Sequence, residues 1–131
     1  MKENRVAILT GASSGIGKAL AYLLAEEYDC LYLLGRKVEA LEQIKTELKD
    51  KKARLEVISM DLGNEEEVLR AADLVLAKEQ KIHLLVNNAG LSQRAYAAET
   101  PIEIERKLLD VNYFGPILLT KRLLGALRNS E

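Results

Sequence analysis

A chain of 131 residues with a formal net charge of -1 has the length of a single domain and no electrostatic signature of a nucleic-acid-binding protein. Its content of 48% hydrophobic and 30% charged residues is ordinary for a globular protein, and neither a signal peptide nor a membrane span is visible. The single cysteine, Cys30, excludes an internal disulfide and favours a cytoplasmic location, with a small buried residue as its expected role rather than a reactive thiol.

The first predicted element is a short strand at residues 6–9, which leads into the glycine-rich stretch 10–17. A strand that enters a glycine-spaced turn and then a helix forms a diphosphate site, because free N–H groups and the helix dipole face the anion. Gly11 is expected to make the tight turn, Gly15 to let the backbone approach a phosphate, and Gly17 to let helix and strand pack closely. The spacing is G-x-x-x-G-x-G, and an ordinary turn remains the alternative.

Apolar runs of strand length alternate with helical periodicity along the rest of the chain, which predicts βαβ units and a parallel sheet. Further strands are predicted at residues 30–34, 55–60 and 82–86, with the third strand near a sheet edge because Glu56 interrupts it. Three helices between these strands show apolar stripes at helical spacing. The stripes are Ile16, Leu20, Leu23 and Leu24; then Leu41, Ile44 and Leu48; then Val68, Ala71, Ala72, Val75 and Leu76.

Two polar residues mark the boundaries of the third helix and the fourth strand. Asn64 is the predicted N-cap of the third helix, and Glu67 completes a capping box three residues later. His83 lies near the start of the fourth strand. We expect it to be a strand-end residue with a satisfied hydrogen bond, and a catalytic base is the alternative.

The last third of the chain is predicted to hold a loop and one long helix. Residues 91–99 have the polar composition of a loop. Thr100 and Pro101 then predict a helix start, as the cap and the first-turn proline. The helix that follows is unusually apolar, and the pair at residues 115–116, Gly-Pro, should bend it.

The residues after the second predicted strand bear on which nucleotide binds. Where a carboxylate usually receives the ribose 2′-hydroxyl of NAD, this chain has Arg36 and Lys37, and a guanidinium can hold a phosphate bidentately. This favours NADP over NAD; the alternative is two solvated residues at a helix start, where cations are unfavourable. Asp61 and Leu62 follow the third strand, where they are placed to accept from an adenine amino group and to flank the ring. The alternative, which explains this dipeptide nearly as well, is that it only marks the boundary before the next helix.

Four motifs occur in order: T-G-x-x-x-G-x-G at residues 10–17, Asp-Leu at 61–62, N-N-A-G at 87–90 and D-V-N-Y-F-G at 110–115. Together they closely resemble the short-chain dehydrogenase/reductase (SDR) family. The resemblance covers residues 5–128, roughly the first half of a family domain. It implies an α/β fold, a three-layer Rossmann-type parallel sheet of order 3-2-1-4 with helices on both faces, lacking the later strands of the full domain.

The same resemblance assigns roles to particular positions. Asn112 corresponds to the asparagine of a catalytic tetrad, whose main-chain carbonyl holds a water molecule in a proton relay. No metal site is implied. The implied cofactor-binding residues are Gly11, Ser13, Ser14, Gly15, Ile16, Gly17, Arg36, Lys37, Asp61, Leu62, Asn88, Ala89, Gly90 and Val111.

The catalytic serine and the Tyr-x-x-x-Lys pair of the family fall beyond Glu131, and none of the 5 tyrosines has a lysine four residues later. Residues 1–131 are therefore expected to be a single NADP(H)-binding Rossmann domain from an NADP-dependent oxidoreductase, inactive alone, whose complete form acts on a small carbonyl or alcohol. The alternatives are a non-catalytic NADP(H)-binding module and a structural or interaction protein. A homo-oligomer is expected, formed through the last helix or the edge of the fourth strand.

Overall fold

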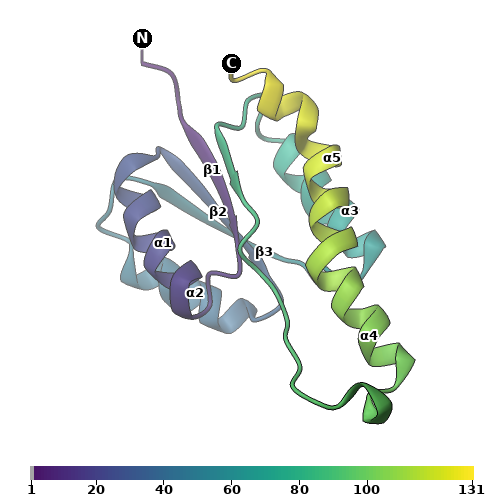
Figure 1. Cartoon of the computed structure of the whole chain (residues 1–131). Helices are drawn as coiled ribbons and strands as arrows, with labels where there is room; N and C mark the ends of the chain where they lie inside the picture. The colour runs from purple at the N-terminus through teal and green to yellow at the C-terminus, as the bar shows by residue number, and fades with distance from the viewer. Residues whose placement is uncertain (1) are drawn as a thin grey trace.

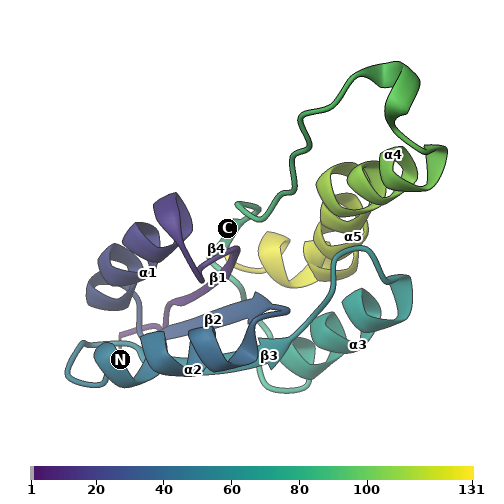
Figure 2. The ribbon, with the colours of Figure 1, turned by 90° about the horizontal axis from the view of Figure 1, so that it is seen from below.

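The computed structural model describes residues 2–131. Its four parallel strands lie in the order β3-β2-β1-β4, as predicted, with β3 at one edge. Helices α1 and α2 cover one face, and α3 and α5 cover the other, with α4 extending past the sheet (Figures 1 and 2). The elements are β1 (Val6–Thr10), α1 (Gly15–Glu27), β2 (Cys30–Gly35), α2 (Val38–Glu47), β3 (Arg54–Ser59), α3 (Glu65–Leu76), β4 (Leu84–Val86), α4 (Ile102–Leu109) and α5 (Gly115–Arg128).

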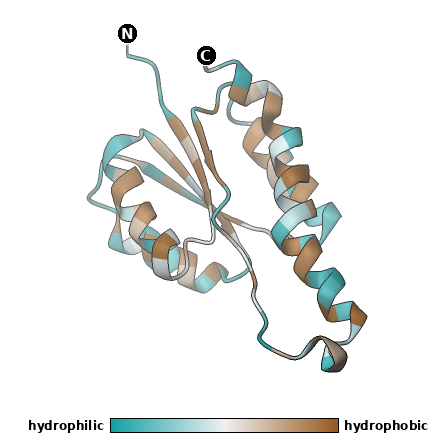
Figure 3. Cartoon of the chain, in the orientation of Figure 1, coloured by the Kyte–Doolittle hydropathy of each residue, from teal (hydrophilic) through white to brown (hydrophobic). Residues whose placement is uncertain are grey.

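Successive residues of the two central strands alternate between two hydrophobic cores. Ala7, Leu9, Leu31 and Leu33 pack beneath α1 and α2, whereas the residues between them pack against α3 and α5. Both strands are therefore buried on both faces, as their continuous apolar sequence predicts, and Figure 3 colours β1 as largely hydrophobic. Because all neighbouring strands pair in parallel, the carboxyl ends of the four strands reach the same edge of the sheet.

The apolar stripe predicted for α1 is wrong in part. Ile16 and Leu23 are 76% and 62% exposed, and the hydroxyl group of Tyr22 reaches Glu47 of α2 from another side of the helix. Small residues occupy most of the contact because α1 packs close to the sheet, and periodicity alone selects the larger apolar residues. The buried positions are Gly17, Ala21, Leu24 and Ala25.

The predicted capping box of α3 is half present. The side chain of Asn64 accepts a hydrogen bond from the backbone N–H of Glu67 at 3.1 Å, which confirms the cap. The carboxylate of Glu67 does not return to Asn64. It accepts instead from the N–H of Asp61 at 3.4 Å, which ties the helix start to the end of β3.

The start of α4 also differs from the prediction. Pro101 occupies the cap position, while the Thr100 hydroxyl donates to the carbonyl of Tyr96 at 3.1 Å across a 3₁₀ turn at Ala97–Glu99. The single long helix that the sequence predicts is interrupted: a π-helical turn at Asp110–Phe114 separates α4 from α5, and Pro116 lies in the first turn of α5. No helix within residues 2–131 is long and apolar enough to cross a membrane.

Strand β4 is shorter than predicted, and His83 lies just before it. The imidazole Nδ1 of His83 accepts a hydrogen bond from the N–H of Val6 at 3.0 Å, which confirms one of the two bonds that a satisfied histidine makes. The Nε2 atom is buried and has no hydrogen-bond partner among the described residues. Since β1 begins at Val6, this contact lies at the amino end of the strands.

Candidate functional site

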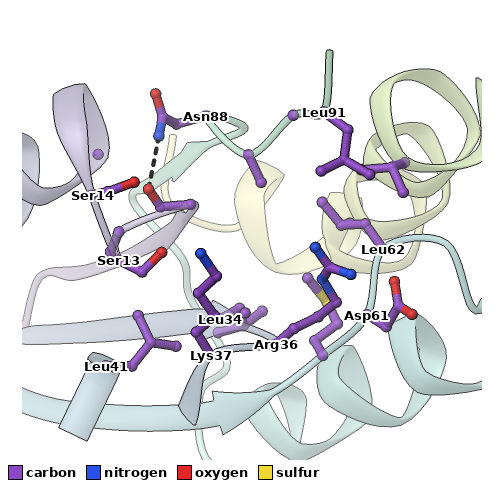
Figure 4. A pocket seen from close by; sticks show the side chains of 18 of the residues that line it. Ser13, Ser14, Leu34, Arg36, Lys37, Leu41, Asp61, Leu62, Asn88 and Leu91 are labelled. Carbon is purple, nitrogen blue, oxygen red and sulfur yellow. Dashed lines mark hydrogen bonds between the residues drawn. The ribbon is translucent and has the colours of Figure 1, made fainter. Parts of the chain in front are cut away.

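A cavity of about 370 Å³ opens at the carboxyl ends of the four strands, where the loops after them meet (Figure 4). Its walls contain every residue predicted to contact a cofactor except Gly15. These residues are Gly11, Ser13, Ser14, Ile16, Gly17, Arg36, Lys37, Asp61, Leu62, Asn88, Ala89, Gly90 and Val111. The sheet thus gathers into one cavity four motifs that are far apart in the sequence.

The turn between β1 and α1 has the backbone conformation that its glycines favour. Gly11 and Gly15 have φ values of +72° and +57°, in the left-handed region that side chains with a Cβ rarely adopt. A Cβ atom on Gly17 would lie 1.9 Å from the carbonyl oxygen of Gly11, so α1 can start this close to β1 only with glycine there. A Cβ on Gly15 would meet nothing within 4 Å, because this residue faces the open mouth of the turn rather than the cavity wall.

The amino end of α1 presents N–H groups that side chains leave free. Ser14 occupies the cap position without a capping side-chain hydrogen bond, and the first turn contains no acidic residue. The positive end of the helix dipole therefore has no carboxylate in its own first turn, and the cap side chain does not occupy its N–H groups. A phosphate group fits such a helix end on both counts, through its charge and through its hydrogen-bond acceptors.

One hydroxyl group joins the ends of β1 and β4. Thr10 Oγ1 accepts hydrogen bonds from the N–H groups of Asn88 and Ala89, each at 3.0 Å, and donates to the carbonyl of Val86 at 3.4 Å. The Asn88 side chain in turn donates through Nδ2 to the carbonyl of Gly11 at 3.1 Å (Figure 4). These bonds fix the glycine turn and the N-N-A-G turn as one unit.

Arg36 and Lys37 extend from the end of β2 toward the cavity (Figure 4). Both residues are exposed, and neither forms a salt bridge with any residue of the described chain. Lys37 is the N-cap residue of α2, where the helix dipole disfavours a cation. Two unpaired positive charges at this place are therefore available to a phosphate, and a bidentate contact is open to Arg36.

Asp61 and Leu62 form the wall after β3. The carboxylate Oδ1 of Asp61 accepts from the N–H of Gly63 at 2.8 Å, which fixes its orientation and leaves the second oxygen free for another donor. Leu62 is largely buried, and its carbonyl lies against the start of α5: a Cβ atom on Gly115 would be 2.3 Å from that oxygen. The backbones of the two segments therefore touch directly.

Asn112 lies in the π-helical turn and does not reach the cavity wall. Its side-chain amide binds both backbone groups of Leu91: Nδ2 donates to the carbonyl oxygen, and Oδ1 accepts from the N–H, each at 2.7 Å. Both ends of the amide thus tie the loop after β4 to the helix, which engages the side-chain oxygen and one side-chain N–H of Asn112 within the chain.

Sequence reasoning missed six residues of the cavity wall. Most of them are next in sequence to a residue that was predicted to bind the cofactor, at the end of a predicted strand or turn. That position could have identified them. Leu41 has no such neighbour, because it reaches the cavity from within α2. The six are Ala12, Leu34, Gly35, Leu41, Met60 and Leu91.

Comparison with known proteins finds close relatives of this arrangement. Dehydrogenase/reductase SDR family member 7B of Rattus norvegicus is 35% identical over 131 residues, covering 95% of this chain and 40% of the relative. Human dehydrogenase/reductase SDR family member 7 is 38% identical over 120 residues, covering 88% of this chain and 35% of the relative.

Two solved structures superimpose closely on the same fold. An alcohol dehydrogenase from the archaeon Thermococcus sibiricus, complexed with 5-hydroxy-NADP, has a TM-score of 0.91 and 32% identity, covering 98% of this chain and 55% of that one. L-Sorbose reductase from Gluconobacter frateurii, complexed with NADPH and L-sorbose, has a TM-score of 0.90 and 27% identity, covering 98% of this chain and 49% of that one.

The chain thus spans about two fifths of the curated relatives and about half of the solved structures. The family model for short chain dehydrogenases matches residues 5–131, nearly the whole sequence. The cavity at the strand ends, the ordered motifs around it and this match lead to one conclusion: the chain belongs to the short-chain dehydrogenase/reductase family of oxidoreductases.

Proposed function

We propose that these residues form the cofactor-binding part of an NADP(H)-dependent carbonyl reductase or alcohol dehydrogenase. The observation that carries the proposal is a single cavity with an uncapped helix end on one wall and two unpaired cations on another. NADP(H) has anionic groups for both places, the diphosphate and the 2′-phosphate, whereas NAD(H) lacks the second. Further support comes from the two solved relatives described above, which were crystallised with 5-hydroxy-NADP and with NADPH.

Each wall of the cavity has a proposed task. The turn with Ser13, Ser14, Gly15 and Ile16 and the amino end of α1 hold the diphosphate, and Gly11 and Gly17 shape that turn. Arg36 and Lys37 hold the 2′-phosphate. Leu62 flanks the adenine ring, and the free oxygen of Asp61 accepts from its amino group. Asn88, Ala89, Gly90 and Val111 line the remaining wall toward the nicotinamide end.

NADPH, when bound, supplies the hydride for reduction of a carbonyl carbon. The residues that line the cavity, Leu91 and Val111 among them, would hold and orient the cofactor. We assign the main-chain carbonyl of Asn112 to the water molecule of a proton relay, since its side chain is held by Leu91. Residues 1–131 contain no Tyr-x-x-x-Lys pair, so we expect them to bind the cofactor as a single domain without turnover.

We also propose that the protein forms a homo-oligomer. On the outer side of α5, Ile117 and Leu124 are 36% and 46% exposed, and the preceding turn exposes Tyr113 and Phe114, whose rings pack edge to face at 5.1 Å. Exposed apolar side chains gathered along one helix are typical of an interface. The open edge of β4 is the second candidate surface. The single buried cysteine fits the proposed cytoplasmic location.

Titration with NADPH and NADH tests the cofactor proposal directly. We expect NADPH to bind at least about tenfold more tightly than NADH, because only NADPH carries the group that Arg36 and Lys37 are placed to hold. Adenosine 2′,5′-bisphosphate and AMP form a matched pair without the nicotinamide and should show the same preference. Equal affinities would overturn the NADP preference, and no binding of either dinucleotide would overturn the cofactor-binding function itself.

A further inference from the structure

His83 holds both backbone groups of Val6 at the end of the sheet opposite the cavity. The backbone N–H of His83 donates to the carbonyl of Val6 at 2.8 Å, and its Nδ1 accepts from the N–H of Val6 at 3.0 Å. The imidazole thus takes the place of a backbone carbonyl where β1 begins and β4 has not yet started. Strand β4 has 3 residues and, within residues 2–131, pairs with β1 alone. These two bonds are therefore a large share of what aligns the two strands.

The hydrogen bond from Val6 determines where the imidazole carries its proton. Because Nδ1 is an acceptor, the neutral ring has its proton on Nε2. The side chain is only 11% exposed, and Nε2 makes no hydrogen bond in the described chain. The nearest carboxylate oxygen, Oε1 of Glu3, is 3.6 Å from Nε2, beyond hydrogen-bond length, and Lys81 binds that same oxygen at 2.7 Å.

We propose that His83 is a proton-sensitive latch between β1 and β4. Histidine is the side chain that ordinarily changes charge between about pH 5 and about pH 8. A doubly protonated imidazole has two donors and no acceptor, so its Nδ1–H would face the N–H of Val6 and the bond between them would be lost. Acidification therefore releases the imidazole from Val6, whereas neutral pH restores the bond.

The charges around the latch act in both directions. Glu3 attracts an imidazolium and Lys81 repels it, and the two are paired with each other. Arg5 is directed away, with its guanidinium 4.4 Å from the centre of the Tyr28 ring.

Two other elements beside the latch contribute groups that are already paired within the chain. At the start of β2, Asp29 accepts from the N–H of Arg5 at 2.8 Å and pairs with Lys52 at 3.1 Å. Helix α5 reaches this region through Ala126, whose carbonyl accepts from the N–H of Ile82 at 3.0 Å. Among the described residues, the N–H of Val6 is the hydrogen-bond partner whose bond requires an unprotonated Nδ1 on His83.

Release of the latch would affect the cavity because the turn after β4 forms one of the cavity walls. The strand runs directly from His83 to Asn88, and its pairing with β1 comprises three residue pairs, Ala7 with Leu84, Ile8 with Leu85 and Leu9 with Val86. When the first contact opens, the remaining ladder is short and its cavity end is held by the Thr10 hydroxyl. Acid is therefore expected to loosen β4 from its amino end while the cavity turn stays bonded.

Amide hydrogen exchange at Val6, followed by NMR across the pH range, tests the latch. In the wild-type chain we expect protection of the Val6 amide, corrected for intrinsic exchange, to fall about tenfold between about pH 7.5 and about pH 5. His83→Asn is the matched control, since its Oδ1 can accept from Val6 as Nδ1 does but does not titrate; its protection should change less than about twofold. Equal pH dependence in the two proteins would overturn the proposal.

A second measurement needs no variant and decides the matter if His83→Asn fails to fold. The imidazole nitrogen shifts of His83 in the wild-type chain should show the Nε2–H tautomer at neutral pH. They should then titrate together with the loss of Val6 protection. An Nδ1–H tautomer, or titration of His83 without any change at Val6, would overturn the latch.

Discussion

The side-chain amide of Asn88 donates to the carbonyl oxygen of Gly11 at 3.1 Å and so joins the turn after β4 to the turn after β1. We expect Asn88→Ala to lower the free energy of unfolding by about 1–2 kcal/mol, because the partly buried carbonyl loses its partner. Nucleotide affinity should fall with it, since the glycine turn loses a support. Asn87→Ala is the control: its bond to Thr120 is equally long but exposed, so a loss as large as that of Asn88→Ala in urea unfolding would contradict this account.

Substitution of two glycines by alanine should have opposite effects on stability, because the backbone is crowded at Gly17 and open at Gly125. Gly17→Ala would bring a Cβ within 1.9 Å of the Gly11 carbonyl oxygen, so we expect a loss of several kcal/mol, at least about 3, or failure to fold. Gly125→Ala in α5 meets nothing within 4 Å and should raise stability by about 0.5–1 kcal/mol, because alanine favours helix. Thermal unfolding of both variants checks the pair, and similar shifts would show that packing at Gly17 is not tight.

Removal of the guanidinium at position 36 should change cofactor preference rather than general affinity. We expect Arg36→Ala to weaken NADPH binding by about 1.5–3 kcal/mol and to leave NADH binding within about twofold. Arg128→Ala removes the same group from the exposed end of α5 and should affect neither cofactor. Equal weakening of both cofactors by Arg36→Ala would mean that Arg36 does not contact the 2′-phosphate.

The buried thiol of Cys30 should be protected from alkylating reagents, and its ionisation should lower the free energy of unfolding at alkaline pH. Burial raises its pKa to about 11, and burial together with the hydrogen bond to Glu79 raises the pKa of Tyr32 as well. The unfolded thiol ionises at about pH 8.5, so stability that is complete below that pH is lost as the pH rises toward the folded value.

Two measurements test these expectations for Cys30, and the first separates its contribution to the alkaline loss of stability from that of Tyr32. Unfolding free energies of the wild type and Cys30→Ala, compared between pH 8 and pH 10, should show a shallower alkaline loss in the variant. Iodoacetamide at pH 8 should modify the folded protein no faster than it unfolds. Modification at the rate of a free thiol would show that the side chain is accessible.

Self-association should depend on the outer side of α5. Leu124→Lys places a charge on the exposed apolar surface without touching the core, so we expect sedimentation at micromolar concentration to shift toward monomer. Leu23→Lys makes the same exchange at an exposed leucine of α1 and serves as the control. A monomeric wild type, or equal shifts in both variants, would remove α5 as the interface.

The strands and the cavity could be predicted because the signals behind them are local, whereas the strand order was implied by the resemblance to the family. Continuous apolar runs such as residues 30–34 predict strands that are buried on both faces, and the spacing of the glycines predicts the turn after the first strand. The contact face of α1 could not be predicted in the same way, because close packing selects Gly17 and Ala21 over Ile16 and Leu23.

Other features that the sequence did not predict depend on hydrogen bonds that lie outside the local patterns. The double hydrogen bond between Asn112 and Leu91 joins residues 21 positions apart and leaves no trace in either local pattern. The prediction of Thr100 as a helix cap was wrong for a similar reason. Its hydroxyl donates to the carbonyl of Tyr96 in a turn that the sequence pattern does not predict. Local chemistry predicts which elements form, and tertiary contacts decide which polar groups they use.

Gly115 lies so close to Leu62 that a Cβ atom at position 115 would be 2.3 Å from the carbonyl oxygen of Leu62. Leu62 lines the cavity, and Asn112 lies three residues before Gly115 in the π-helical turn. Any larger residue at position 115 would therefore push the loop after β3 away from the start of α5 and disturb the cavity wall and the π-helical turn together.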